Sequence, residues 1–191
     1  VDWCNEVDKV IVPCKHNKKV FEKCKVKKPI EIIPHIGNYY KKPISLKLVE
    51  KTISNLGIKP NDFVFYTIGQ WSERKGIEDT IIAYLNSFTN KDNTCLIVKT
   101  FKSNYSKEEK NKIRILVNSI LRKYINPAKV ILILDELTEE EINILHSIGH
   151  CYISLCKAEG WGLGVFDAIS FQKSILITGY GGQTDFVEKS F

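Results

Sequence analysis

The chain of 191 residues is 43% hydrophobic and 26% charged, with a formal net charge of +6. These values are ordinary for a globular protein and allow one well-packed core with a piece of a second. No run of about 18 apolar residues and no signal peptide is recognisable, so we expect neither a transmembrane helix nor a secretory leader. The chain contains no methionine, and we expect it to be a fragment of a longer protein.

The positive charge is concentrated near the start of the chain. Residues 1–60 carry 13 Lys and 6 Asp or Glu, whereas residues 61–191 carry 15 Lys or Arg and 16 Asp or Glu. The lysines between Lys15 and Lys28 suit either a solvated helix face or contact with anionic lipid or nucleic acid. Aromatic residues do not alternate with them as stacking on bases requires. We favour the solvated face, expect no nucleic-acid partner, and keep peripheral membrane contact as an alternative.

Six cysteines occur, without a CxxC pair or a Cys–His spacing of the zinc type. Cys95, Cys151 and Cys156 lie inside apolar runs, which is typical of buried small hydrophobic residues. We expect reduced thiols, no metal site and a cytoplasmic location.

The elements of the first 60 residues are short. We predict in order a strand, a helix, a strand, a linker and a helix at residues 7–12, 16–24, 30–34, 35–43 and 44–56. Pro13 and Pro34 end the two strands, and Gly57 is a stop signal for the last helix.

From residue 62 onward, apolar runs alternate with amphipathic segments. Strands are predicted at residues 62–69, 95–101, 130–137, 151–156 and 174–178. Helices are predicted at residues 77–88, 106–124, 139–147 and 164–172. Thr138 and Glu141 have the spacing of a capping box. This alternation predicts an α/β fold, with a Rossmann-like parallel sheet covered by helices on both faces.

A glycine-rich loop follows the predicted strand at 151–156, at the sheet edge where ligands bind in such folds. Gly160, Gly162 and Gly164 lead into a helix, and free N–H groups at a helix N-terminus suit a phosphate. Glu159 and Asp167 flank these glycines, and carboxylates accept hydrogen bonds from hydroxyl groups. The pattern predicts a site for a nucleotide that carries ribose and a second sugar.

A second loop, GQWSERKG, follows the predicted strand at 62–69. Arg74 and Lys75 suit a diphosphate, although surface cations of this kind usually face solvent. Because both loops leave the same sheet edge, we expect these cations to be ligand residues. Trp71 and Trp161 lie in the two loops, where stacking on a ligand and packing between elements are both open.

Three segments of the chain resemble GT4-type retaining glycosyltransferases of the GT-B fold. IGQWSERKGIEDTIIAY resembles their phosphate-binding strand–loop–helix, and LTEEEINILHSIGHCYISLCKAEGWGLGVFDA resembles the stretch with the E-x7-E motif. ITGYGGQTDFVEK resembles the glycine pair with the acidic segment that follows. The resemblance covers residues 62–190, and residues 1–40 resemble the end of the family's N-terminal domain with the crossing linker.

The resemblance implies two Rossmann-like domains with the active site between them, of which this chain holds one half of the GT-B fold and a remnant. We predict that residues 1–43 are the end of the N-terminal acceptor-side domain plus the interdomain linker. Residues 44–191 would form the C-terminal nucleotide-sugar-binding domain, truncated at its C-terminus.

The resemblance also implies roles for single residues. Glu159 matches the first acid of the motif, beside the donor sugar, and is the expected catalytic residue. Asp167 matches the second acid, at the ribose hydroxyls, where Asp is one methylene shorter than Glu. Lys75 matches the diphosphate lysine, while the usual arginine falls at Gln70, whose missing charge Arg74 can supply. The expected donor site is completed by Gly69, Gly160, Gly162, Leu163 and Gly164.

The implied activity is that of a hexosyltransferase using a UDP-, GDP- or ADP-sugar. It would transfer the sugar, with retention, to a hydroxyl of a carbohydrate, lipid or protein. No cofactor or metal is expected, because cations and helix dipoles meet the charge of the departing diphosphate. The isolated chain should bind nucleotide but be inactive or weakly active. Alternatives are a non-catalytic nucleotide-sugar-binding module, favoured by Gln70 and Asp167, and a basic membrane-surface or nucleic-acid adaptor.

Overall fold

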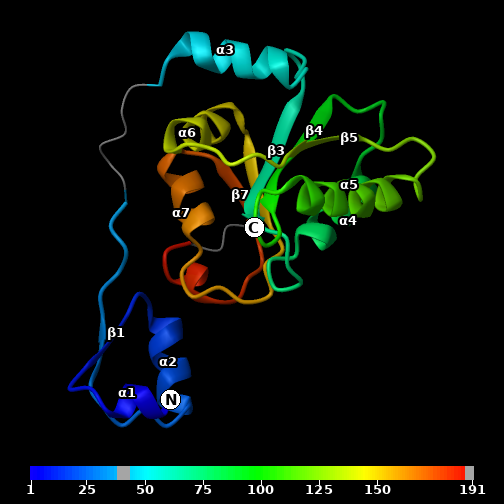
Figure 1. Cartoon of the computed structure of the whole chain (residues 1–191). Helices are drawn as coiled ribbons and strands as arrows, with labels where there is room; N and C mark the ends of the chain where they lie inside the picture. The colour runs from blue at the N-terminus through cyan, green and yellow to red at the C-terminus, as the bar shows by residue number, and fades with distance from the viewer. Residues whose placement is uncertain (38–43, 188–191) are drawn as a thin grey trace.

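A computed structural model describes residues 1–37 and 44–187. A small N-terminal unit lies at the bottom of Figure 1, and a larger α/β domain lies above it. Most of the linker predicted at residues 35–43 falls outside the described residues, so the domain boundary at residue 43 stays a prediction. No helix among the described residues is long and apolar enough to cross a membrane.

The N-terminal unit is a single parallel β-α-β turn preceded by a short helix. Its elements are α1 (Asp2–Asn5), β1 (Val10–Val12), α2 (Lys15–Lys23) and β2 (Ile30–Ile32). The two strands pair in parallel, with Val10 opposite Ile30. The predicted strands and helix are confirmed, with both strands shorter than expected.

The α/β domain contains a five-stranded sheet in the order β5-β4-β3-β6-β7, with every neighbouring pair parallel. Its elements are α3 (Leu46–Asn55), β3 (Phe63–Gln70), α4 (Ile77–Ser87), β4 (Thr94–Phe101), α5 (Lys107–Leu121), β5 (Lys129–Ile133), α6 (Glu139–Ile148), β6 (Cys151–Ser154), α7 (Leu163–Ser170), β7 (Ser174–Ile177) and the 3-10 turn η1 (Gly182–Asp185). The predicted fold class is confirmed. The strand predicted at 130–137 is wrong in its last four residues, since β5 ends at Ile133 and Asp135 pairs with Lys110 outside the sheet.

Helices cover both faces of this sheet, as Figure 1 shows. One core cluster joins α4 and α5 to the sheet through side chains such as Ile81, Val98 and Val117. The other joins α6 and α7 to the opposite face through side chains such as Tyr66, Leu145 and Ala168. Burial of these apolar side chains is the main stabilising contribution to the domain. The expected capping box at the start of α6 is confirmed.

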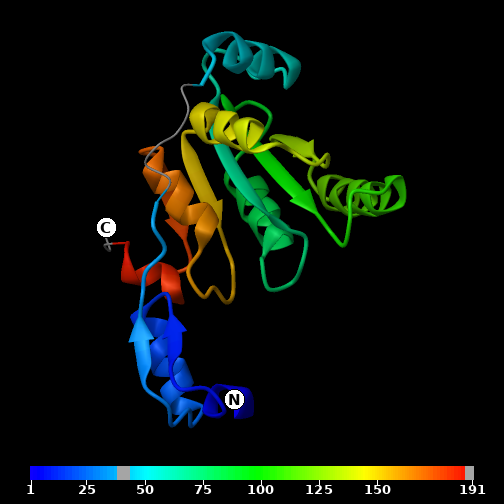
Figure 2. The ribbon, with the colours of Figure 1, turned by 60° about the vertical axis from the view of Figure 1, so that its left-hand side comes forward.

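The strand order creates a crevice between β3 and β6. From β3 the chain proceeds to β4 and β5 on one side, and it later returns to β6 and β7 on the other. Loops after β3 and β6 therefore leave in opposite directions, which opens a ligand-binding crevice at the carboxyl ends of these strands. In Figure 2 the carboxyl ends point toward the N-terminal unit. The two loops at this crevice are those that carry Lys75 and Glu159.

Candidate functional site

Backbone contacts tie the loops after β3 and β6 together. The carbonyl oxygen of Arg74 accepts hydrogen bonds from the Lys157 N–H at 2.8 Å and the Cys156 thiol at 3.1 Å. In return, Nη1 of Arg74 donates to the carbonyl oxygen of Ala158 at 2.6 Å. These bonds hold the two predicted cations directly against the start of the glycine-rich loop.

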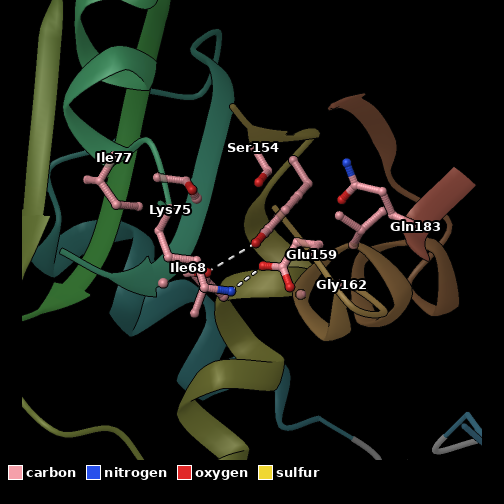
Figure 3. Close-up of a pocket in the computed structure, with 12 residues that line it drawn as sticks. Ile68, Lys75, Ile77, Ser154, Glu159, Gly162 and Gln183 are labelled. Carbon is pink, nitrogen blue, oxygen red and sulfur yellow. Dashed lines mark hydrogen bonds and ion pairs between the residues drawn. The ribbon is translucent and has the colours of Figure 1, made fainter. Parts of the chain in front are cut away.

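Lys75 and Glu159 form an ion pair across the crevice, as Figure 3 shows. Nη1 of Arg74 lies 3.8 Å from the same Glu159 oxygen, and the Cys156 thiol lies 3.4 Å from it. The Glu159 side chain is 15% exposed and that of Lys75 is 26% exposed. The predicted diphosphate lysine and the predicted sugar-side acid thus neutralise each other. A bound diphosphate has to compete with Glu159 for Lys75.

A small polar pocket of about 30 Å³ lies beside this ion pair. Five predicted site residues line it, namely Gly69, Lys75, Glu159, Gly162 and Gly164. The remaining lining residues are Thr67, Ile68, Ile77, Tyr152, Ser154, Val165 and Gln183. The volume suits about one water molecule, so a larger ligand needs more space than this pocket offers.

Helix α7 begins at this pocket. Its N-cap, Gly162, has φ of +90°, a left-handed conformation that favours glycine, and makes no side-chain cap hydrogen bond. The first N–H groups of a helix have no partner within the helix. Gly164 approaches Tyr152 so closely that a Cβ atom would collide with the tyrosine hydroxyl. That hydroxyl donates to the carbonyl oxygen of Ile68 at 3.1 Å. Burial raises the pKa of Tyr152, so it is a neutral hydrogen-bond donor here.

Gln183 lines the same pocket, although it was not among the residues predicted to bind the donor; the sequence suggested only that its loop bears on the choice of sugar. Its side chain is fully buried, and Nε2 donates to the carbonyl oxygens of Thr178 at 2.7 Å and Tyr180 at 3.4 Å. These two acceptors fix the amide orientation. Among residues 1–37 and 44–187, Oε1 of Gln183 has no hydrogen-bond partner. A buried acceptor at a pocket wall suits a ligand hydroxyl. Its position after the pair Gly181-Gly182 is the signal from which it could have been found.

Other predicted site residues lie around the pocket without lining it. The Gln70 side chain donates to the carbonyl oxygen of Lys102 at 2.7 Å and so points toward the loop after β4. Leu163 is largely exposed at the start of α7. Asp167 lies one turn further along α7, where its charge adds to the effect of burial in raising the pKa of Tyr152.

Gly160 faces the N-terminal unit. Its carbonyl oxygen accepts a hydrogen bond from the Cys14 thiol at 3.1 Å. Nearby, Oδ2 of Asp185 accepts from the backbone N–H of Lys15 at 2.6 Å, at the start of α2. Asp185 thus caps the first turn of α2, a helix of the N-terminal unit that is distant from it in the sequence.

The two tryptophans of the ligand loops, Trp71 and Trp161, pack against other parts of the protein. Trp71 and Trp161 are buried, and the Trp161 ring lies 4.6 Å from that of Phe186, centroid to centroid. Nδ1 of His150 accepts the Val64 N–H at 2.9 Å, so this histidine supports the sheet. Within the part of the chain that the structure describes, no group of three His, Cys, Asp or Glu side chains is arranged to hold a metal ion.

No family model and no curated protein sequence matches the chain. Several solved structures do. HepE from Anabaena, in complex with UDP and glucose, is 19% identical with a TM-score of 0.77, over 99% of this chain and 49% of HepE. A glycosyltransferase from Rickettsia africae is 16% identical with a TM-score of 0.71, over 95% of this chain and 48% of that protein. The pneumococcal O-GlcNAc transferase GtfA, in complex with UDP and GlcNAc, is 18% identical with a TM-score of 0.64, over 96% of this chain and 32% of GtfA.

These similarities identify the fold. The α/β domain corresponds to one Rossmann-like half of the GT-B glycosyltransferase fold. The chain spans about half the length of HepE and of the Rickettsia protein, and about a third of GtfA.

Proposed function

We propose that this chain is the donor-binding part of a GT4-type retaining glycosyltransferase. The reaction would transfer a hexose from a nucleotide diphosphate sugar to a hydroxyl acceptor, with the anomeric configuration kept. The observation that carries the proposal is the convergence of Lys75, Glu159 and the α7 N-terminus on one crevice. A cation, a carboxylate and free amide groups match the phosphate and hydroxyl groups of such a donor.

The diphosphate would occupy the region between Lys75 and the start of α7. The ammonium group and the amide N–H groups of α7 are both suited to anionic oxygens. As the bond to the sugar breaks, negative charge grows on the departing diphosphate, and these groups stabilise it. Arg74, half-exposed and 3.8 Å from Glu159, is placed to contribute a second positive charge.

The sugar would lie toward Glu159 and Gln183. Once Lys75 turns to the phosphates, the Glu159 carboxylate is free to accept hydrogen bonds from sugar hydroxyls. Gln183 Oε1 offers a second buried acceptor at the same pocket. Two acceptors at fixed positions favour a hydroxyl-bearing ring over an apolar group. Asp167, further along α7, is proposed to contact the ribose.

The known ligands of similar structures support this proposal. HepE was solved with UDP and glucose and with UDP-glucose, and GtfA with UDP and GlcNAc. All three structures contain a uridine nucleotide, and two contain a free sugar. Because the identities are below 20%, these ligands support only the general class of the donor, a nucleotide sugar.

Calorimetric titration with UDP, GDP and ADP tests the proposal. We expect one of them to bind, and Lys75→Ala to weaken it by about tenfold, since charge-assisted contacts of this kind contribute about 1.5–3 kcal/mol. Lys157→Ala is the matched control, because it removes an exposed lysine next to the same loops. Absence of binding by all three nucleotides at millimolar concentration would contradict donor binding by this chain.

Turnover distinguishes the enzyme from a non-catalytic binding module. The Gln70 side chain donates a hydrogen bond to the carbonyl oxygen of Lys102 and does not line the pocket. This observation favours a non-catalytic binding module. Incubation of the full-length protein with the bound donor and hydroxyl acceptors should yield a product whose anomeric configuration, read by NMR, equals that of the donor. Nucleotide binding without any transfer or donor hydrolysis would support the module.

A further inference from the structure

Lys99 is a buried lysine at the carboxyl end of β4, beside the candidate donor site. It is paired in register with Ile68 of β3, which lines the pocket, and with Ile133 of β5. Residues paired in this way project from the same face of a sheet. Cys95 and Ile97, at two-residue spacing on this strand, belong to the core on the α6 and α7 side. Lys99 therefore lies on the face of the sheet from which α7 and its phosphate-binding end approach.

Lys99 makes no hydrogen bond or ion pair among residues 1–37 and 44–187, and its ammonium nitrogen is not fully shielded from solvent although the side chain is almost completely covered. The residue is only 4% exposed. Its Nζ atom lies 5.8 Å from the ring centroid of Phe101 and 4.9 Å from that of Tyr105. Burial lowers the pKa of Lys99, while Asp135 and Glu136 oppose that shift. An ammonium group on a side chain that is so largely covered has three donors and little water to satisfy them, and aromatic rings satisfy them only in part.

The surroundings of Lys99 suit a flat, neutral acceptor. The rings of Phe101 and Tyr105 lie 5.2 Å apart, centroid to centroid, and offer a surface against which a heterocycle can pack. The negative charges of Asp135 and Glu136 disfavour a further anionic group beside Lys99, so a phosphate does not suit this position. A carbonyl oxygen carried by an aromatic base supplies both the acceptor and the flat ring.

We infer that Lys99 reads the base of the donor nucleotide and selects a base with a carbonyl group, uracil or guanine, over adenine. The inference rests on the proposed function, which places the diphosphate at Lys75, one strand away along the same sheet edge. Uracil carries a carbonyl oxygen at O4 and guanine at O6, whereas adenine carries an amino group that donates. An ammonium group opposite an amino group leaves two donors facing each other and no acceptor.

Titration of the chain with UDP, GDP and ADP, before and after Lys99→Met, tests the inference. Methionine keeps the unbranched shape and removes the donors. We expect the wild-type chain to bind UDP or GDP about tenfold or more tightly than ADP. Lys99→Met should abolish this preference by weakening the carbonyl-bearing nucleotide while leaving ADP unchanged. Lys102→Met, an exposed lysine after the same strand, is the control and should leave all three affinities unchanged.

Three results would overturn the inference: equal affinities of the wild-type chain for the three nucleotides, an equal loss for all three in Lys99→Met, or an unchanged preference in that variant. If Lys99→Met does not fold, the wild-type chain is titrated with an analogue of its preferred nucleotide that lacks O4 or O6. A loss of about tenfold is expected, and an unchanged affinity would overturn the inference. Binding of all three nucleotides without preference would refute only the role of Lys99, whereas binding of none would refute the proposed function.

Discussion

At the scale of single residues, the Lys75–Glu159 ion pair is the main feature of the site. Both side chains are mostly buried, and each is needed by a different part of the proposed donor. The pair satisfies two charges that would otherwise be poorly solvated. Beside the pair lies a pocket of about 30 Å³.

Removal of the Glu159 charge should strengthen the binding of a nucleoside diphosphate. In Glu159→Gln, Lys75 and Arg74 no longer have a competing carboxylate, so we expect a threefold to fivefold gain in affinity, about 1 kcal/mol. Calorimetry measures this effect. Glu73→Gln is the control, because Glu73 is exposed and lies 3.6 Å from Lys157. A loss of affinity as large as that of Lys75→Ala would show that Glu159 supports nucleotide binding in another way.

The buried thiols should react slowly below pH 9. Burial raises the pKa of Cys156 and Cys14, and raises that of Cys95 to about 11. Only the thiolate is nucleophilic, so a raised pKa lowers the reactive fraction at neutral pH, and reaction accelerates as pH rises. Alkylation by iodoacetamide at pH 7.5, followed by mass spectrometry, should modify exposed Cys24 first. Equal rates at Cys156 and Cys24 would instead indicate an activated thiol beside Glu159.

The sequence did not reveal that Lys99 and Gln183 are buried. The Lys99 side chain follows the apolar run of β4, but its burial also depends on the neighbouring strands β3 and β5, which come from separate segments. Gln183 is buried because Thr178 and Tyr180 accept its amide hydrogens. Charges and amides are normally exposed, so only tertiary structure identifies these exceptions.

At the scale of elements, α7 is positioned by one close approach. Gly164 lies so near Tyr152 that a Cβ atom would overlap the hydroxyl, whereas Gly179 has nothing within 4 Å. We expect Gly164→Ala to lower the free energy of unfolding by about 1–3 kcal/mol. Gly179→Ala should change it by less than about 0.5 kcal/mol. Urea denaturation measures both.

A double-mutant cycle checks the cause of that loss. Tyr152→Phe removes the hydroxyl that meets the new methyl group, so Gly164→Ala should be less destabilising in the Tyr152→Phe background than in the wild type. An equal loss in both backgrounds would show that Gly164 is required for another reason, such as the N–H groups at the start of α7.

Element positions could largely be predicted, whereas their pairing could not. The alternation of apolar runs and amphipathic segments identified each strand of the sheet, and Gly57 and Thr138 marked helix boundaries correctly. The register, such as Ile68 opposite Lys99, depends on packing between helices and sheet. The strand after α5 was extended too far because Leu134 and Leu137 continue the apolar pattern after the chain has left the sheet.

At the scale of the whole molecule, the N-terminal unit is joined to the α/β domain beside the glycine-rich loop. The joint includes the Asp185–Lys15 and Cys14–Gly160 hydrogen bonds and an edge contact between the rings of His16 and Tyr180. Gly160 directly follows Glu159 in the chain. A displacement of the N-terminal unit at Gly160 would therefore act on the residue next to Glu159. The site is thus placed at a boundary between two parts of the chain, as ligand sites often are.

Asp185→Ala should loosen this joint. The carboxylate accepts the first N–H of α2, and loss of such a cap costs about 1 kcal/mol. We expect hydrogen exchange of the α2 amides to accelerate about fivefold, with exchange in β3 and β4 unchanged. Asp92→Ala is the control, since it removes a carboxylate that accepts a backbone N–H, that of Thr89, in a loop of the α/β domain. Unchanged exchange in α2 would show that the unit is held by other contacts.

The most direct test of the central claim is an NMR titration of the isotope-labelled chain with UDP, GDP and ADP. If a nucleotide diphosphate binds at the crevice between β3 and β6, the amide signals of residues 69–76 and 158–167 should shift, together with those at the end of β4 near Lys99. Signals of α5 and of the outer part of the N-terminal unit should stay in place. Shifts confined to the lysines of α2, or none with any of the three nucleotides at millimolar concentration, would contradict a donor site in this crevice.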